Sequence, residues 1–352
     1  MKSSQPLRTA DQKIVLKKPL HCIAVLGAGI AGLSCATELQ QAGAKVTMFE
    51  KSGGAAGRMS TRRGEDWQCD HGAQYFTARD PDFLAELKRW QQAGVAELWT
   101  PRISVVRGES PRDNAERLAA DMQQIDRFVG VPRMTAPGHW LADRLQIMTE
   151  TTVKQLQRRA DGWHLFFAEH AWLDEYFDAV LLALPAPQAI TLLGPLAPEL
   201  SEVARGSTMR GSWAMILRFA AQVALPFDAA FVNAEPLRWI ARDSSKPRRQ
   251  GLETWLLHAS AEWSEAHIEE NGTRVAQELL DAFRQLGGPE PAAWTAHRWR
   301  YADTEPALSK VFAWDAEQEL GLCGDWLNGG KVEGAWLSGS ALARQVIENF
   351  RA

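Results

Sequence analysis

The apolar pattern is most regular between residues 22 and 50. Ile23-Ala24-Val25-Leu26 is a short continuous apolar run, as found in strands buried on both faces of a parallel sheet. From Ile30 to Ala42 the apolar residues recur at helical spacing, and Gly43 supplies a stop signal. Lys45 to Glu50 again has the pattern of a strand. Together these segments predict a complete β-α-β unit.

Similar patterns return in the middle and at the end of the chain. Residues 178–184 and 320–323 predict further buried strands, and a helix is predicted from about residue 334 onward. Residues 141–150 also have a helical pattern. We therefore expect one α/β domain whose pieces are far apart in the sequence.

The region between these pieces has a different pattern. A helix is predicted over residues 273–285, where apolar residues recur every fourth position. Short, aromatic-rich strands are predicted at residues 213–219, 230–232, 239–241, 254–258 and 294–299. Several strands and a helix without a β-α-β rhythm indicate an antiparallel sheet in a second domain.

Composition excludes several classes of protein. The chain has 352 residues, of which 45% are hydrophobic, and its net charge is -4, so we expect no nucleic-acid partner. No apolar run approaches the ~18–20 residues of a membrane-spanning helix, and we expect no membrane partner. The four cysteines are scattered, which predicts neither disulfides nor a metal site and favours a cytoplasmic location.

The first β-α turn carries a dinucleotide-binding motif. Gly27, Gly29 and Gly32 form GxGxxG between the predicted strand and helix, where they permit a tight turn and close approach of a pyrophosphate. Glu50 ends the second strand, at the position where a carboxylate binds the adenosine ribose. These residues predict a bound dinucleotide.

Two further residues favour FAD over NAD. Arg58 follows a glycine-rich loop that returns toward the phosphates, where a guanidinium can bind a pyrophosphate oxygen. Asp325 lies between a strand and the last helix, where its side chain can bind ribityl hydroxyls. We expect FAD to be bound without a covalent bond.

This combination resembles the renalase family, especially its bacterial members, within the FAD-dependent amine oxidase superfamily. The resemblance covers nearly the whole chain. It is carried by the stretches Val25–Gly32, FEKSGGAAGRMSTRR from Phe49, DHGAQYFTARD from Asp70, LALPAPQA from Leu182, WIARDSSKP from Trp239, TWLLH from Thr254, HRWRYA from His297 and CGDWLNGGKVEGAWLSG from Cys323.

The resemblance implies the fold and the domains. The fold is that of p-hydroxybenzoate hydroxylase: a Rossmann-type FAD-binding domain and a substrate domain made of an antiparallel sheet and helices. Residues 21–77, 141–190 and 310–352 would form the FAD-binding domain. Residues 78–140 and 191–309 would form the substrate domain, and residues 1–20 a loose extension.

The resemblance also implies the FAD contacts. The AMP half, the isoalloxazine floor and the flavin edge would be held by Gly27, Gly29, Ala31, Gly32, Glu50, Lys51, Gly57, Arg58, Met59, Gly72, Ala73, Gln74, Val153, Asp325, Val332, Gly334, Ala335 and Trp336. One departure from the family pattern is Ala56, which replaces the first of two glycines before the arginine. Its methyl group should crowd the turn slightly.

Renalases are flavin oxidases of 2- and 6-dihydro isomers of NAD(P). The resemblance therefore implies hydride transfer to flavin N5, reoxidation by O2 to H2O2, and release of NAD(P)+. Loss of hydride makes an aromatic pyridinium, so we expect no general base; the protein mainly stacks two flat rings. Our candidate pocket residues are Tyr75, His258, His297 and Trp299.

Some of these residues have a second interpretation. His258 and His297 are also consistent with hydrogen-bonded core histidines, and Trp299 with core packing. The basic loop at Lys246, Arg248 and Arg249 is either a solvated surface, which we favour, or a contact for substrate phosphates. We interpret Trp213, Trp255 and Trp263 as sheet packing, and leave open whether Arg62 and Arg63 touch substrate.

Three other functions remain open. A flavin amine oxidase would need an aromatic cage, which is difficult to build from three tyrosines, although tryptophan could substitute. A non-catalytic flavin protein would hold FAD that no small reductant bleaches. A pure NAD-dependent dehydrogenase would leave Arg58 and the GDW…GAWLSG segment without a role.

Overall fold

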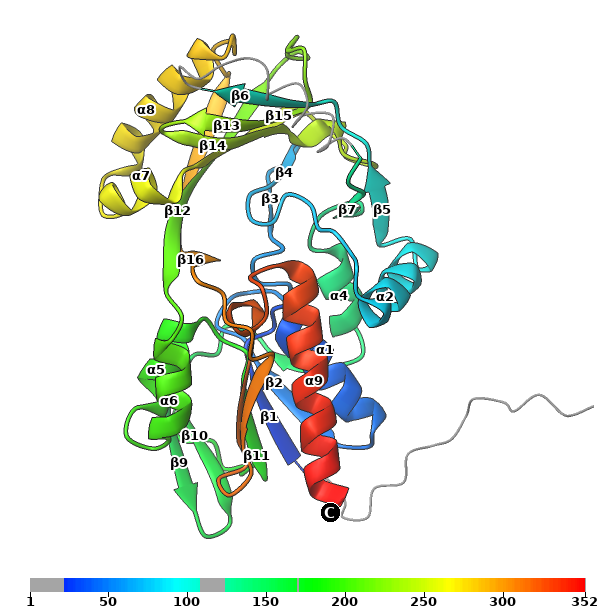
Figure 1. The fold of residues 1–352 in the computed structure, drawn as a ribbon, viewed down its shortest axis with the longest axis vertical. Helices are drawn as coiled ribbons and strands as arrows, with labels where there is room; N and C mark the ends of the chain where they lie inside the picture. The colour runs from blue at the N-terminus through cyan, green and yellow to red at the C-terminus, as the bar shows by residue number, and fades with distance from the viewer. Residues whose placement is uncertain (1–21, 108–123, 170, 352) are drawn as a thin grey trace, which may run out of the picture.

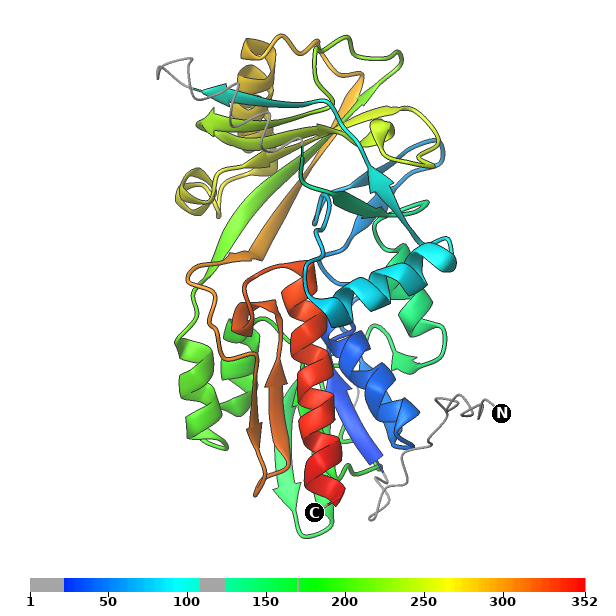
Figure 2. The same ribbon diagram turned by 45° about the vertical axis from the view of Figure 1, so that its right-hand side comes forward.

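The computed structural model describes residues 22–107, 124–169 and 171–351, and shows two stacked lobes (Figures 1 and 2). The lower lobe contains a mostly parallel sheet and the upper lobe an antiparallel sheet. The predicted extension over residues 1–20 lies outside the described residues.

The lower sheet has the strand order β17-β18-β11-β1-β2-β8. Its strands are β1 (Cys22–Leu26), β2 (Lys45–Phe49), β8 (Gln146–Met148), β11 (Ala179–Leu182), β17 (Phe312–Asp315) and β18 (Leu320–Cys323). All neighbours are parallel except β17 and β18. The central strand β1 is buried almost throughout, as its continuous apolar run predicts.

The prediction of a helix over residues 141–150 is wrong. Helix α4 (Ala136–Ala142) ends where that prediction begins, and β8 follows it. Ile147 pairs with Met48 at the edge of the parallel sheet. The apolar and polar residues between 141 and 150 form too short a pattern for its periodicity to distinguish a helix from a strand. Pairing with the edge of β2 makes residues 146–148 a strand.

Helices α1 (Ile30–Gln41) and α9 (Val332–Arg351) lie side by side on one face of this sheet (Figures 1 and 2). They approach so closely that a Cβ on Gly339 would lie 1.9 Å from the carbonyl oxygen of Ala31. The Ser34 hydroxyl donates to the Trp336 carbonyl at 2.8 Å. This contact brings the N-termini of both helices to the same end of the sheet, where the dinucleotide motif lies.

The other face is covered by α5 (Ala186–Leu193), α6 (Pro198–Arg205) and the hairpin of β9 (Val153–Arg159) and β10 (Gly162–Phe167). Leu193 and Leu200 belong to the same apolar cluster as Leu26 and Leu182. The domain division remains a proposal, and this packing leads us to assign residues 191–205 to the FAD-binding domain.

The upper sheet has the order β16-β12-β15-β14-β13-β6. Its strands are β6 (Ile103–Arg107), β12 (Met209–Phe219), β13 (Ala229–Ala234), β14 (Leu237–Arg242), β15 (Glu253–Ala259) and β16 (Ala293–Thr304). Helices α7 (Ala261–Ala266) and α8 (Gly272–Gln285) cover one face. Trp255 is fully buried there, and its ring lies 6.0 Å from that of Phe283.

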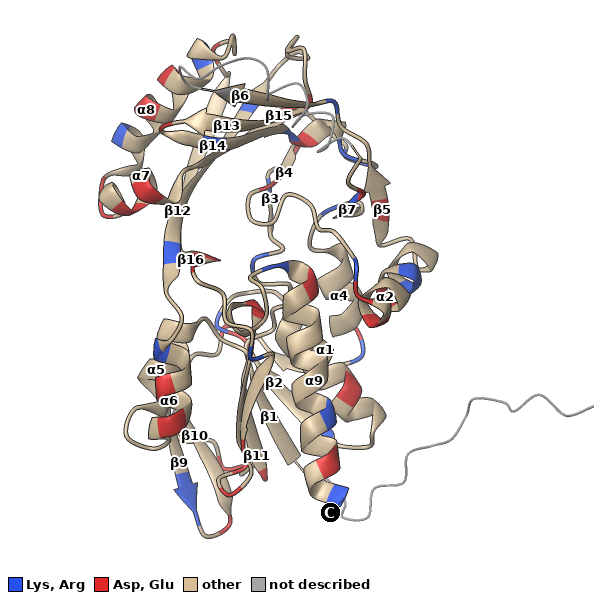
Figure 3. Ribbon diagram, viewed as in Figure 1, with Lys and Arg blue, Asp and Glu red and all other residues tan. Residues whose placement is uncertain are grey.

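Trp213 and Trp263 belong to the same buried cluster, which confirms the interpretation of all three tryptophans as packing residues. Acidic and basic residues lie along one side of α8, the other side of which is buried against the sheet (Figure 3). The opposite face of the sheet is therefore the one that turns toward the lower lobe (Figure 1).

Five smaller elements link the lobes and were not predicted. They are β3 (Thr61–Arg63), β4 (Gln68–Asp70), α2 (Pro81–Gln92), β5 (Ala96–Trp99) and β7 (Arg127–Gly130). The β3–β4 hairpin rises from the lower lobe to the underside of the upper sheet (Figure 1). Thr254 of β15 donates its hydroxyl to the Gln68 carbonyl at 3.0 Å, which fixes that contact.

Candidate active site

A cavity of about 760 Å³ lies between the two lobes and is lined by residues of both. Its lower wall comes from the start of α1, the loop after β4 and the start of α9. Its upper wall comes from β12, β13, β14, β15 and β16. A cavity at the carboxyl ends of parallel strands is where α/β sheets bind ligands.

The three motif glycines have different roles. A Cβ on Gly27, where φ is +97°, would lie 2.6 Å from the Ala183 carbonyl, and one on Gly32 would lie 2.0 Å from the Gly27 carbonyl. Both positions therefore permit close packing of strand and helix. Gly29 has open space where a Cβ would be, and it lines the cavity. The residues present thus leave room for a dinucleotide at the helix N-terminus.

Glu50 is built into the same turn. One carboxylate oxygen accepts from the Ala28 amide at 2.8 Å, and the other accepts from the Ser52 amide at 2.8 Å. Glu50 does not line the cavity, and neither do Lys51, which is exposed, or Val153. The cavity thus ends short of the predicted adenosine contacts.

Ala56 occupies a strained backbone position. Its φ is +91°, in the left-handed region that favours glycine, and its amide donates to the Ala28 carbonyl at 2.9 Å. Its methyl group faces Gly138 of α4, where an added Cβ would lie only 2.5 Å from it. The predicted crowding is therefore present, and Gly138 accommodates it.

Arg58 and Asp325 line the cavity and bind each other. The Arg58 Nη1 atom lies 3.0 Å from Asp325 Oδ2, the Nη2 atom bonds Oδ1, and Nη1 also donates to the Ala302 carbonyl at 3.2 Å. Asp325 opens the short helix η3 (Asp325–Leu327). The pairing was not predicted, and it holds the guanidinium in one orientation.

The floor of the cavity is backbone held close to Arg58. A Cβ on Gly72 would lie 2.0 Å from the Arg58 carbonyl, which also accepts from the Ala73 amide at 2.9 Å. The Gln74 side chain donates to the Asp70 carbonyl at 2.8 Å. Ala31, Met59 and these three floor residues all line the cavity.

The predicted residues of α9 separate into two groups. Val332 and Ala335 line the cavity. Gly334 instead packs on the chain, because a Cβ there would lie 1.7 Å from the Asn328 carbonyl, and the Trp336 ring packs 5.8 Å from Phe83. Similarly, Gly57, with φ +55°, packs against Gly29.

The interpretation of Lys246, Arg248 and Arg249 as a solvated surface loop is wrong for Lys246 and Arg249. Lys246 is fully buried, with its Nζ atom 2.9 Å from Asp70 and 2.7 Å from Asp243. Arg249 is also buried, 2.6 Å from Asp70. Only Arg248 is exposed.

Burial alone would raise the pKa of Asp70, but the charges of Lys246 and Arg249 outweigh it and hold that pKa well below its usual value. Burial and the Asp70 charge raise the pKa of Asp243. This network lies directly behind the floor, since Lys246 Nζ is 3.5 Å from the Gln74 side-chain oxygen. The i, i+3 spacing of Asp243 and Lys246 was its only signal in the sequence.

One row of side chains crosses the sheet on its cavity face. Phe231 pairs with Trp239, and Trp239 pairs with His258 across three neighbouring strands. Ser212 and Trp299 form a second pair on the same face. All five line the cavity. Phe231, Trp239 and Ser212 were missed, because a two-residue alternation does not show which face of a sheet is covered by helices.

Tyr75 meets this row from the floor side. Its ring lies 5.7 Å from Trp239, and the Arg127 guanidinium lies 5.1 Å above its centre. The two rings are in contact, so they do not form the two walls of a cage around a ligand.

The three histidines near the floor are held neutral. Burial is the main cause that lowers the pKa of His258 to about 4, of His297 to about 4 and of His71 to about 3. His258 lines the cavity. His297 does not, and its ring instead packs 4.8 Å from that of His71. Arg62 lies close enough to lower the pKa of both His71 and His297.

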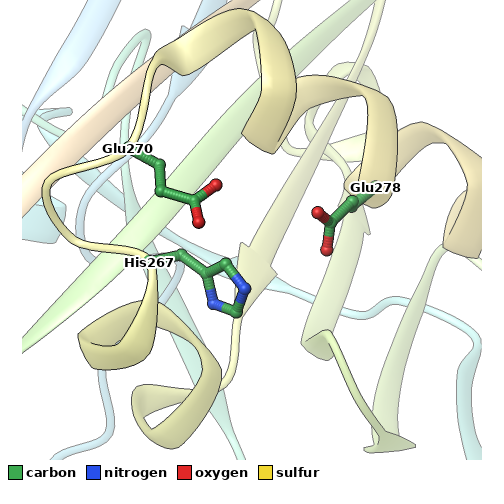
Figure 4. Close-up of side chains that lie close together, drawn as sticks. All are labelled: His267, Glu270 and Glu278. Atoms are coloured by element: carbon green, nitrogen blue, oxygen red, sulfur yellow. The ribbon is translucent and has the colours of Figure 1, made fainter.

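One group of possible metal ligands lies away from this cavity, among the residues that the structure describes. His267, Glu270 and Glu278 place their ligand atoms within 4.8 Å of one another beside α8 (Figure 4). Arg274 lies 3.2 Å from Glu270 and 3.7 Å from Glu278. We interpret the group as an ion-pair cluster, because Arg274 pairs with both carboxylates and offsets part of their negative charge.

Comparison with known families identifies the class of protein. The family model for flavin-containing amine oxidoreductases matches residues 115–347, and one for NAD(P)-binding Rossmann-like domains matches residues 25–90. The chain belongs to the flavin-containing amine oxidoreductase family. Its cofactor is FAD, which agrees with the open position at Gly29 and the lining of the cavity.

Within this family the chain is renalase-like. It is 22% identical to renalase of Mus musculus over 306 residues, which cover 82% of this chain and 86% of the mouse protein. It is also 26% identical over 205 residues to the tRNA 5-methylaminomethyl-2-thiouridine biosynthesis bifunctional protein of Magnetococcus marinus, covering 48% and 30% of the two chains.

Solved structures confirm the fold. A putative protoporphyrinogen oxidase from Exiguobacterium superimposes with a TM-score of 0.73 at 13% identity, covering 93% of this chain and 99% of the other. Cyclohexylamine oxidase from Brevibacterium oxydans gives a TM-score of 0.69 at 13% identity, covering 93% and 98%. In the described part of the chain, no helix is long and apolar enough to cross a membrane.

Proposed function

We propose that this flavoenzyme oxidises the 2- and 6-dihydro isomers of NAD(P) to NAD(P)+, with O2 as the final electron acceptor. Bound FAD would supply the redox chemistry, in which a hydride is taken up at N5 and, together with one proton from solvent, reduces O2 to H2O2. The observation that carries the proposal is the cavity face of the upper sheet. There, Phe231, Trp239 and a neutral His258 form a mainly aromatic row on three neighbouring strands.

This row suits a reaction that needs ring stacking and no proton abstraction. Aromatic side chains bind a flat ring by its face or edge and exclude water from it. His258 is a weak base at neutral pH, because its pKa lies at about 4. The carboxylate of Asp303 also lines the cavity but is paired with Arg238. A dihydropyridine becomes an aromatic pyridinium when it loses hydride, so it requires no base.

Renalase-like similarity over 82% of the chain supports this substrate class. The four cysteines are all free thiols, and we propose a cytoplasmic location on that basis. Substrate and O2 are the partners that the proposal requires.

The experiment is anaerobic mixing of the purified flavoprotein with each dihydro isomer. Flavin absorbance near about 450 nm should fall within seconds, whereas ordinary NADH should bleach it far more slowly. Admission of air should restore the colour with formation of H2O2. No bleaching by any isomer would overturn the proposal.

The alternative is oxidation of a small amine, as the family and the likeness to cyclohexylamine oxidase allow. The contact between Tyr75 and Trp239 leaves no aromatic cage between these two rings, which weighs against it. Rapid H2O2 formation with an amine, and none with dihydro isomers, would establish the alternative. A flavin that neither class reduces would indicate a non-catalytic protein.

A further inference from the structure

The carbonyl of His71 accepts two hydrogen bonds from side chains of the upper sheet. Trp299 Nε1 lies 2.9 Å from this oxygen, and His258 Nε2 lies 3.1 Å from it. A carbonyl oxygen can only accept, so His258 must carry a proton on Nε2. The backbone next to the cavity floor thereby sets the tautomer of a histidine on the opposite wall.

The other ring nitrogen is then an acceptor. The charged groups that act on His258 are Arg238, Asp303 and Lys246, and burial has the largest effect on its pKa, which falls to about 4. The ring is neutral at pH 7, and a neutral imidazole with its proton on Nε2 has a lone pair on Nδ1.

This lone pair is available to a ligand. Nδ1 of His258 forms no hydrogen bond within the described part of the chain, and it is not among the enclosed polar atoms that lack a partner. His258 lines the cavity. Its neighbour in the row, Trp239, offers only an N–H donor, and no described residue accepts from that donor. The cavity wall therefore presents a fixed hydrogen-bond acceptor, Nδ1 of His258, beside the aromatic ring of Trp239.

We propose that His258 Nδ1 accepts a hydrogen bond from an N–H group on the flat ring of the substrate. This inference rests on the proposed function, in which that group is the primary carboxamide of the dihydronicotinamide. His258 is then a specificity-determining residue that recognises the carboxamide and orients the ring. Trp299 donates to the same His71 carbonyl as His258.

The test compares two substrates that differ only in this donor. One is the dihydro isomer of NAD, and the other is the same isomer of the 3-acetylpyridine analogue, in which a methyl group replaces the amide nitrogen. Apparent affinity and rate are measured from anaerobic flavin reduction. Binding of the two oxidised products is measured by calorimetry, a readout independent of turnover.

Wild type should favour the carboxamide about tenfold, in line with one buried hydrogen bond. His258→Leu should lose this preference, chiefly by weaker binding of the carboxamide compounds. His258→Gln should retain most of it, because its amide can donate to the His71 carbonyl and still present an acceptor oxygen. Trp299→Phe removes the other bond to the same carbonyl, and should affect both substrates equally.

Each contrary outcome has a distinct meaning. Equal use of both substrates by wild type would overturn the inference, and so would equal losses for both in His258→Leu at full flavin content. If no dihydro isomer reduces the wild-type flavin, the proposed function fails. The product-binding preference then still decides whether His258 reads a carboxamide.

Discussion

Arg58 and Asp325 are 267 residues apart in the sequence and form a two-pronged ion pair in the wall of the cavity. Arg58 belongs to the glycine-rich loop after the first β-α-β unit, and Asp325 follows the last strand of the parallel sheet. The pair joins the two ends of the predicted FAD-binding domain in the wall of the cavity between the lobes.

Removing the aspartate charge should therefore weaken flavin binding. Asp325→Asn leaves Arg58 without its ionic partner and less well oriented, and we expect the dissociation constant of FAD to rise about tenfold. The ratio of flavin to protein absorbance after dialysis measures the effect. Arg205→Ala breaks a surface ion pair with Glu202 and is the matched control; its flavin content should stay at the wild-type level. Full occupancy in Asp325→Asn would show that the pair does not support the cofactor.

Relief of the strained turn should stabilise the protein. Ala56→Gly removes the free-energy cost of holding an alanine at a positive φ. The greater conformational entropy of glycine in the unfolded chain offsets part of this gain, and the free energy of unfolding should rise by about 1 kcal/mol. Denaturant unfolding of the FAD-loaded protein measures it. The neighbouring Ala55→Gly, where φ is not positive, should instead lower stability slightly. A loss of stability in Ala56→Gly would mean that the contact with Gly138 outweighs the strain.

The buried charge network should be intolerant of losing one partner. Lys246→Met leaves Arg249 as the one remaining ionic partner that the described residues offer to Asp70 and Asp243, at 2.6 and 3.5 Å. About 3 kcal/mol of stability should be lost. The exposed Arg248→Met is the matched control, with a change below about 0.5 kcal/mol. Because Lys246 lies behind Gln74, the flavin spectrum should also shift in Lys246→Met. An unchanged unfolding midpoint would contradict the network's role.

Stability should fall as the solution becomes more acidic. The pKa of His71 is about 3 in the folded protein and ordinarily about 6.5, so the unfolded chain binds the proton more readily. The stability that the neutral form of His71 contributes is therefore fully present above about pH 6.5, and it is lost as the pH falls toward 3. His71 alone should account for about 2 kcal/mol between pH 7 and pH 5.

His71→Phe should flatten this dependence, as measured by urea unfolding at both pH values. His258 and His297 act in the same direction, since burial lowers the pKa of each to about 4. A wild-type protein equally stable at pH 7 and pH 5 would show that these histidines are not held neutral.

The local elements follow closely from the sequence. The run from Ile23 to Leu26, the helix that begins at Ile30 and the acidic end of the second strand were all predictable, because short-range periodicity and glycine spacing determine them. The strand at residues 146–148 was not, since its conformation depends on a neighbour almost a hundred residues earlier.

The cofactor and the family could be predicted from the sequence alone, because GxGxxG between a strand and a helix is typical of a dinucleotide-binding turn, and the longer stretches resemble one family of flavoproteins. Only the tertiary structure decides that Arg58 and Asp325 bind each other, that Lys246 is buried, and that Trp239 and His258 share a face. These relationships join residues on different strands and loops, and their burial and pairing arise only when two sheets close over one cavity.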